Sequence, residues 1–515
     1  MRKTDSLKSI SWVFLIMLLG KLLSLVANQA YLSFFGADNE QLNIFSWALQ
    51  IPNYLFQSLG TALSSVVIPL FAALCVQEKR EEANRFGSNL ITVSTLLTLG
   101  LVAVGMALSG LLPGLTEFRD KGYAAMALRL LMPVMLFYSL SFIYQGILQS
   151  LGRFTAAALV NLPSGIVTLL YVATLAGRFG VTGLLLAVVL GLALQALILI
   201  PFARRAGFRY RPVLDLRDGS IRTAGKMTVP IILGASAYQF NMFFNNTMMT
   251  NVAPGSVTLF NFVQTLILSS VMTLVLAITS VEYPRLTAHA ASGDMAGFRE
   301  SLSATVRGLL FLLLPITGGL ICLGRPLLTL ISLHGRVVPE NITTEYRFLC
   351  MYCLCIVFLG LKEIADRAFY SLQTTRISAL VGVVIMGINI VLGFILSKFT
   401  PMAANGIPFA YSVAVILGTS FLLLRLRRRV GAFGGDILAT LWKTGLATVL
   451  MCAVVVLCFR GLSGRAGDSL LWRLVLVGIP TLLGMIVYFL LTWLLKTRPI
   501  REFQAQYLHR KRGEA

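Results

Sequence analysis

Long apolar segments constrain this chain more than any other feature. Fourteen stretches of roughly twenty or more mainly apolar residues follow one another, separated by short polar turns, and each is long enough to cross a bilayer as a helix. The chain is 57% hydrophobic and only 12% charged, with a mean hydropathy of +0.81, so a water-soluble globule would expose large apolar surfaces. The sequence therefore predicts an all-α, polytopic membrane protein. The predicted helices span 9–35, 42–74, 89–112, 122–148, 156–177, 183–203, 223–252, 259–285, 302–324, 346–371, 378–398, 405–426, 438–459 and 471–496.

The first apolar segment is predicted to be a membrane span. It runs far beyond the length of the apolar region of a signal peptide, and no cleavage site follows it.

The net charge of +22 has two explanations. An excess of 43 Lys and Arg over 21 Asp and Glu would suggest a nucleic-acid partner in a soluble protein, whereas membrane proteins collect basic residues in their cytoplasmic loops. With an even number of spans, both termini lie on one side, and that side holds 31 of the 43 basic residues when helix ends are counted with their loops. The other side holds 11, and Lys21 remains inside the membrane. We therefore expect cytoplasmic termini and no nucleic-acid partner.

The basic loop 204–222 divides the chain into six helices followed by eight. We predict an N-terminal lobe of helices 1–6 (1–203), a C-terminal lobe of helices 7–12 (223–426), and a final segment with helices 13–14 and a basic tail (427–515). No loop is long enough to fold as a separate domain. Pro52 and Gly60 inside the second helix are typical of bent helices that line transporter cavities.

Three groups of polar side chains interrupt the apolar spans of the first, second and seventh helices. A polar group in hydrocarbon is costly, so each group indicates either a wet pathway or hydrogen bonding between helices. Helical spacing places each group on one face, and the three faces together favour a polar cavity facing the N-terminal lobe over interhelical packing. The candidate cavity residues are Lys21, Ser24 and Asn28 on the first helix, Gln50, Asn53 and Gln57 on the second, and Asn241 and Asn245 on the seventh.

Charged residues also gather at the ends of two later helices. Their spacing allows ion pairs within one helix, which favours a structural cluster, but carboxylates that exchange partners or protons could also form a gate or a coupling site. Asn389 is a further polar residue inside a span, where a role between helices is favoured over binding a cation. The gate or coupling candidates are Glu282 and Arg285, then Glu363, Asp366 and Arg367 beside Lys362, and Asn389.

The sequence shows no constellation typical of an enzyme or a metal centre. Cys350 and Cys353 form a C-x-x-C, but they lie in an apolar helix where Cys acts as a small hydrophobic residue. The three histidines are scattered, and no nucleophile, base and oxyanion donor can be assembled. We expect a transporter without a metal or a cofactor.

The chain resembles the MviN/MurJ family of lipid II flippases, in the multidrug, oligosaccharidyl-lipid and polysaccharide exporter superfamily. The resemblance extends over nearly the whole chain and rests on the order and spacing of several short strings: "FFGA", "QIPNYL", "ILQSLGRF", "APGSVTLFNFVQTL", "YPRLTAHAASGD" and "DRAFYSLQTTR". It implies an alternating-access flippase in the inner, cytoplasmic membrane. Such a protein moves an undecaprenyl-pyrophosphate-linked saccharide between leaflets, with the headgroup in a cationic cavity and the lipid tail in a groove along helices 13 and 14. Membrane potential or a Na⁺ or H⁺ gradient would drive it.

The sequence departs from this family in the predicted cavity. Lys21 stands where the family has an arginine. Asn28 and the residue before it stand where the family has an Arg-Asp pair. Phe56 and Gln57, and also Thr265, stand where the family has further arginines. An ammonium cannot reproduce the bidentate grip of a guanidinium on a phosphate. The chain is therefore either a divergent lipid II flippase or a relative that moves another headgroup.

A flippase with lipid II as the leading cargo is the favoured function. Lys21 would contact the pyrophosphate and the amide side chains would bind the sugar or peptide. The expected partners are a lipid-linked saccharide, membrane lipids and the cell-wall synthesis machinery. The alternatives are a flippase for another undecaprenyl-linked oligosaccharide of the exopolysaccharide or O-antigen type, an ion-coupled drug antiporter, and a non-transporting scaffold for envelope assembly.

Overall fold

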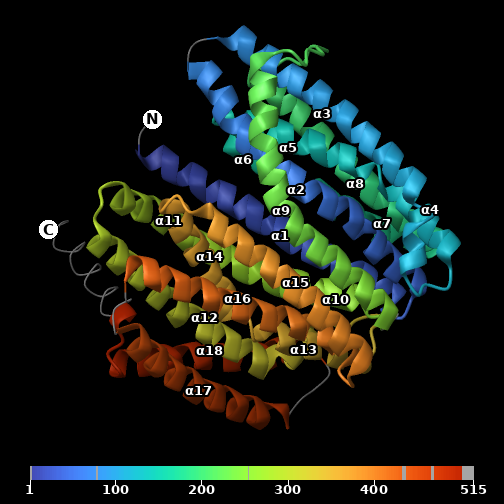
Figure 1. Ribbon diagram of the computed structural model, residues 1–515. Coiled ribbons are helices and arrows are strands. Elements are labelled where there is room, and N and C mark those ends of the chain that lie inside the picture. The colour runs from blue at the N-terminus through green and yellow to red at the C-terminus, as the bar shows by residue number, and fades with distance from the viewer. Residues whose placement is uncertain (1–2, 77–78, 253–254, 432–435, 465–468, 501–515) are drawn as a thin grey trace. The chain divides into compact units, whose positions relative to one another are not determined.

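Helices make up all the regular structure in the described part of the chain. The computed structural model describes residues 3–76, 79–252, 255–431, 436–464 and 469–500 (Figure 1). These residues form two compact units, unit 1 with Met1–Thr258 and Gly335–Val337, and unit 2 with Leu259–His334 and Val338–Ala515.

Unit 1 contains the helices of the first seven predicted spans. Their bounds are α1 Lys3–Phe35, α2 Glu40–Val76, α3 Arg80–Leu108, α4 Lys121–Leu131, α5 Val134–Ser150, α6 Phe154–Ala158, α7 Pro163–Thr174, α8 Ala176–Arg205 and α9 Gly219–Val252, with the 3₁₀ turns η1 Leu112–Leu115 and η2 Leu159–Asn161. Helix α9 packs along α2 and lies in unit 1, and the division into lobes at 204–222 stays a prediction.

Unit 2 contains the remaining spans. Their bounds are α10 Val257–Gln264, which starts at the end of unit 1, the π-helical turn η3 Thr265–Ser269, α11 Ser270–Ala291, α12 Met295–Ser332, α13 Pro339–Cys353, α14 Ile356–Ser371, α15 Thr375–Phe399, the 3₁₀ turn η4 Ala403–Asn405, α16 Gly406–Val430, α17 Asp436–Ser463 and α18 Leu470–Leu494. The last two helices, α17 and α18, pack against each other and against α12.

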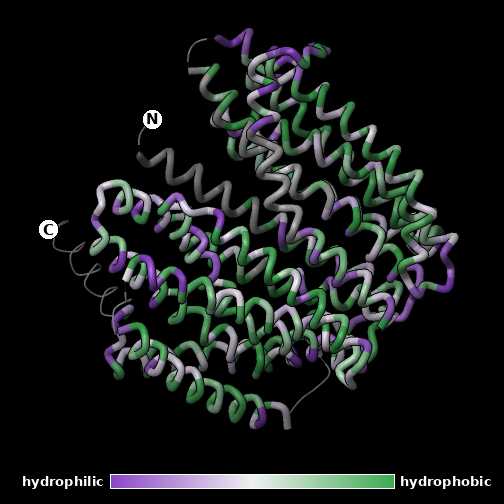
Figure 2. Tube along the Cα trace, viewed as in Figure 1, coloured by the Kyte–Doolittle hydropathy of each residue, from purple (hydrophilic) through white to green (hydrophobic). Residues whose placement is uncertain are grey.

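All fourteen predicted spans appear as helical segments in the predicted order. Within the described residues, ten helical segments are long and apolar enough to cross a membrane, and the α13–α14 pair, bent by 41°, would be an eleventh. Side chains in α1, α2 and α9 are described only in part, so this count leaves those three helices out. Figure 2 shows hydrophobic residues along the helices and hydrophilic residues gathered near their ends. The chain is a multi-pass membrane protein.

Several helices are longer than predicted and several are broken. The spans 122–148, 156–177, 259–285 and 346–371 are each interrupted, by Pro133 between α4 and α5, by Pro163 at the start of α7, by the π turn η3, and by the bend near Leu354. Helix α12 runs well past 302–324 at both ends, because hydropathy detects the apolar part of a helix and not its polar first and last turns. Asp294 begins α12 by accepting a hydrogen bond from Gly297 N at 2.9 Å.

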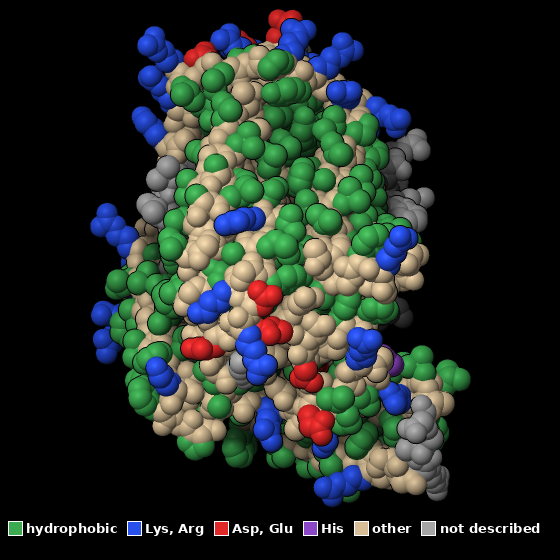
Figure 3. Space-filling view, turned by 90° about the vertical axis from the view of Figure 1, so that its right-hand side faces the viewer, with side chains coloured by type: hydrophobic (Ala, Val, Ile, Leu, Met, Phe, Trp, Pro, Cys, Tyr) green, Lys and Arg blue, Asp and Glu red, His purple; other side chains and the backbone are tan. Residues whose placement is uncertain are grey.

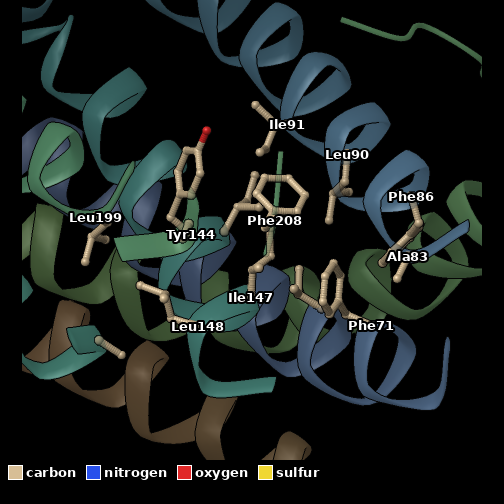
Figure 4. Close-up of a cluster of buried hydrophobic side chains, with 14 of the residues drawn as sticks. Phe71, Ala83, Phe86, Leu90, Ile91, Tyr144, Ile147, Leu148, Leu199 and Phe208 are labelled. Atoms are coloured by element: carbon tan, nitrogen blue, oxygen red, sulfur yellow. The ribbon is translucent and has the colours of Figure 1, made fainter. Parts of the chain in front are cut away.

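Close packing in unit 1 depends on one glycine and one aromatic side chain. A Cβ on Gly60 would lie 2.2 Å from the Phe142 ring, so only glycine allows α2 to approach α5 this closely. Phe208, from the basic loop, is 1% exposed and packs edge-on against Phe71 and Tyr144 (Figure 4).

The basic loop 204–222 is therefore docked on unit 1. Asn89 and Asp215 exchange two hydrogen bonds of 2.8 and 3.0 Å, and Arg85 pairs with Asp215 at 3.2 Å. Lys and Arg side chains gather at this end of unit 1, which is uppermost in Figure 3, while hydrophobic side chains cover much of the visible surface below. Exposed leucines such as Leu96 and Leu97 on α3 provide a surface suited to lipid.

Candidate functional site

The cavity candidates on α1 lie at the predicted helical spacing. Lys21 and Ser24 are exposed and Asn28 is half-buried. The Ser24 hydroxyl donates to the Gly20 carbonyl at 3.0 Å, and Asn28 Oδ1 accepts a hydrogen bond from the Tyr31 hydroxyl at 3.0 Å. Ser24 and Asn28 thus make hydrogen bonds within α1, and a role for Lys21 in binding an anionic group stays a prediction.

The candidates on α2 differ from one another. Gln50 and Asn53 are half-buried, and Asn53 Oδ1 accepts no hydrogen bond from the described residues although the atom itself is buried. The side chain of Gln57 lies outside the described residues. Phe56, where the family resemblance implies an arginine, is 1% exposed.

The two asparagines on α9 are buried inside unit 1. Asn241 is 3% exposed and Asn245 is 0% exposed, and Asn245 Nδ2 donates to Asn241 Oδ1 at 3.1 Å. On the same helix, Asn246 Nδ2 donates to the Tyr54 hydroxyl of α2 at 3.1 Å. In this conformation these α9 amides hydrogen-bond within unit 1, and the role of Asn241 and Asn245 in binding substrate stays a prediction.

A buried network ties α2 to the start of α10, and sequence reasoning missed its central residue, Asn43. Asn43 is 0% exposed; its Nδ2 donates to the carbonyls of Ala37 (2.6 Å) and Asn39 (2.9 Å). Its Oδ1 accepts from the Thr258 N–H at 3.1 Å and the Thr258 hydroxyl at 3.2 Å, and that hydroxyl also bonds Ser46 at 2.8 Å. The available signal was the polar pair Asn43 and Ser46 on one face of the predicted helix. These contacts are the interhelical hydrogen bonding that we had weighed against a cavity.

The charged cluster on α14 forms two ion pairs within the helix. Lys362 Nζ lies 2.6 Å from Asp366 Oδ2, and Arg367 Nε lies 3.0 Å from Glu363 Oε1. The second oxygen of Asp366 accepts a 2.5 Å hydrogen bond from the Ser378 hydroxyl of α15. Asp366 is only 7% exposed, so this cluster joins α14 to α15 through a largely buried carboxylate.

The remaining gate candidates lie on two other helices of unit 2. Arg285 pairs with Glu282 at 3.3 Å within α11, and the Ser301 hydroxyl of α12 donates to Glu282 at 2.5 Å. Asn389 is 0% exposed on α15. The Arg285 side chain is exposed, whereas Asn389 is buried, and the function of these residues as a gate or coupling site stays a prediction.

Metal chemistry finds no support among the described residues. No group of three or more His, Cys, Asp or Glu side chains there could hold a metal ion, and Cys350 and Cys353 are free thiols.

An apolar groove runs between α12, α17 and α18 in unit 2. Its volume is about 500 Å³ and its walls include Pro315 and Gly319 of α12, Met451 of α17, and Gly484 and Phe489 of α18. No described atom lies within 4 Å of a Cβ built on Gly319, so this position faces open space in the groove. At one wall the Tyr488 hydroxyl donates to the Phe311 carbonyl at 2.6 Å, which leaves the surface of the groove almost entirely apolar. A groove of this composition suits a hydrocarbon chain.

Known proteins share this fold and sequence pattern. A solved structure described as lipid II flippase MurJ in an inward closed conformation superposes with a TM-score of 0.75 at 20% identity, over 93% of this chain and 97% of that one. A multidrug-resistance transporter of the MATE family in an inward-facing conformation gives a TM-score of 0.65 at 15% identity, over 80% of this chain and 95% of that one.

Sequence comparison gives the same result. Probable lipid II flippases MurJ from Thermotoga maritima and Vibrio cholerae are 25% and 24% identical, over 92% and 81% of this chain and 93% and 82% of their own lengths. The family model described as lipid II flippase MurJ matches residues 32–476. This chain belongs to the MurJ family of lipid II flippases.

Proposed function

We propose that this protein moves a polyprenyl-diphosphate-linked saccharide, with lipid II as the leading cargo, from the inner to the outer leaflet by alternating access. The observation that carries the proposal is the apolar groove of α12, α17 and α18, in a chain that matches a lipid II flippase family along most of its length. The groove would hold the lipid tail, because an apolar chain that stays in apolar surroundings pays no transfer cost while the headgroup crosses.

Lys21 is the residue proposed to contact the pyrophosphate. It is exposed, and a cation is the expected partner of a phosphate. Gln50, Asn53 and Asn28 would offer donors and acceptors to the saccharide.

The proposed orientation places both termini in the cytoplasm, in the cell membrane. The basic end of unit 1 with the docked loop 204–222 supports it, because basic residues are retained on the cytoplasmic side. Membrane potential or a Na⁺ or H⁺ gradient would drive the cycle, and the cell-wall synthesis machinery would take up the product.

Another lipid-linked headgroup is the second candidate cargo. Phe56 is buried and Thr265 lies in the π turn η3, and both stand where the family resemblance implies arginines. A drug antiporter is less favoured, because no Asp or Glu in the described part of unit 1 is buried to attract an organic cation.

The direct test is flipping of labelled lipid II by the purified full chain in proteoliposomes. We expect transport by the wild type and by Lys21→Arg, and its loss in Lys21→Ala. Lys121→Ala, at the start of α4, is the matched control and should transport normally. Transport by Lys21→Ala at the wild-type rate would remove Lys21 from the mechanism. Preference for a teichoic-acid or O-antigen precursor over lipid II would instead identify the second candidate cargo.

A further inference from the structure

A carboxyl group in unit 2 is buried without a counterion among the residues that the structure describes. Glu345 on α13 is 0% exposed, and neither carboxylate oxygen receives a well-formed hydrogen bond from the described residues. Asp366 gives the contrast, since Lys362 and Ser378 occupy its two oxygens. An ionised carboxylate inside a membrane protein is strongly disfavoured unless it is paired.

Two polar groups can be placed near Glu345. The Ser332 hydroxyl, at the end of α12, lies near the carboxyl group of Glu345 and interacts with it. Helices α13 and α16 run in register, because Ser412 donates to the Met351 carbonyl at 2.6 Å across a sequence separation of 61. The same offset puts Glu345 level with Gly406, next to Asn405. The buried Oδ1 of Asn405 also accepts no hydrogen bond from the described residues.

Charged groups on the surrounding elements do not neutralise Glu345. Helix α12 carries Arg325, and the connection after it carries the exposed Arg336 and also His334, whose Nε2 lies 2.9 Å from the Leu330 carbonyl. Arg473 of α18 donates to the Leu333 carbonyl at 3.3 Å. Helix α13 itself carries Glu340, Arg347 and Tyr346. The Tyr346 hydroxyl donates to the Ile321 carbonyl at 2.8 Å. The turn η4 and the first five residues of α16 carry no titratable side chain. Among the described residues, none of these groups forms an ion pair with Glu345.

We propose that Glu345 is a proton-binding site of unit 2, which holds a proton in this conformation and releases it to water when the corner formed by α12, α13 and η4 opens. A proton neutralises the carboxyl without any further ligand, and the resulting O–H can donate to the Asn405 or Ser332 oxygen. Under the proposed orientation this corner lies at the outer side of the membrane. Proton uptake and release there would make the rate of the cycle depend on the pH of the outer solution, and this last step rests on the proposed function.

Infrared spectroscopy of the full chain in lipid tests the protonation directly. A protonated carboxylic acid has a carbonyl stretch that a carboxylate lacks. At neutral pH we expect this band in the wild type and in Glu340→Gln, which removes an exposed carboxylate from the same helix, and its loss in Glu345→Gln, an isosteric and permanently neutral change. A wild-type spectrum without the band, or a band that survives in Glu345→Gln, overturns the proposal.

Flipping assays test this pH dependence. The protonated fraction of one carboxyl group changes by at most about tenfold per pH unit, so the rate should change by up to that factor. We expect the rates of the wild type and Glu340→Gln to change with the outer pH, and the rate of Glu345→Gln to be independent of it. An equal response of all three proteins, or no response in the wild type, overturns the pH dependence. Absence of any flipping by the wild type would refute the proposed function, and the infrared band would still decide whether Glu345 is protonated.

Discussion

Replacing Asn43 by alanine should destabilise unit 1 by about 2–6 kcal/mol. The substitution removes four hydrogen bonds, and two of the groups left behind, the Ala37 carbonyl and the Thr258 N–H, lose this partner in a buried site. Each buried group left unsatisfied costs about 1–3 kcal/mol, which sets the range. The Asn39 carbonyl still accepts from the Asn43 N–H at 3.1 Å, and the Thr258 hydroxyl keeps Ser46, so neither adds to the estimate.

The measurement is the free energy of unfolding in mixed detergent micelles, with a matched asparagine as control. Asn251 is exposed, its Nδ2 donates to the Leu115 carbonyl at 3.2 Å, and its Oδ1 accepts from the Thr250 hydroxyl at 3.0 Å. Because the Thr250 hydroxyl also bonds the Thr247 carbonyl, Asn251→Ala should cost only about 1–2 kcal/mol. The double variant with Thr258→Val should show a coupling energy of about 0.5–3 kcal/mol, because Asn43 and Thr258 are in direct contact. If Asn43→Ala is no less stable than Asn251→Ala, the network does not hold α2 to α10 as argued.

Four further outcomes are expected. Gly319→Leu should fill the groove and reduce the rate of flipping while the protein stays folded. Gly478→Leu on α18, where a Cβ also meets open space, is the control and should flip at the wild-type rate. Equal rates for the two variants would show that the groove is not needed for transport. Asp366→Asn should lower the free energy of unfolding by about 2–3 kcal/mol through the loss of charge-assisted bonds, and an unchanged value in the same micelle assay would argue against a structural pair. Phe208→Ala should cost about 3–5 kcal/mol and expose loop 204–222 to protease, and resistance equal to wild type would contradict docking. A backbone N–H of the first turn of α12 lowers the pKa of Asp294 from its ordinary value of 3.8. The ionised Asp294 therefore stabilises the fold above pH 3.8, and this stabilisation is lost as the pH falls through the lower pKa of the folded state. In Asp294→Asn, the free energy of unfolding should decrease less at acid pH than in the wild type.

The sequence alone determined the number, order and approximate position of the helices. In a bilayer each spanning segment must satisfy its own backbone hydrogen bonds, so a long apolar run indicates a helix whatever its neighbours are. The prediction was least accurate where tertiary contacts act. The bend between α13 and α14 occurs near Leu354 without a proline or a glycine at the break, and hydropathy gave no sign of it.

The candidate site shows the same division. Helical spacing allows the pair of Lys362 and Asp366, because an i, i+4 pair needs no information from another helix. Spacing could not show that Asn245 is buried, that Asn43 holds the start of α10, or that Glu345 has no counterion among the described residues. Those properties depend on which residues of distant helices pack against each side chain. Only the tertiary structure decides that, because the apolar pattern of a helix face does not specify which other helix packs against it.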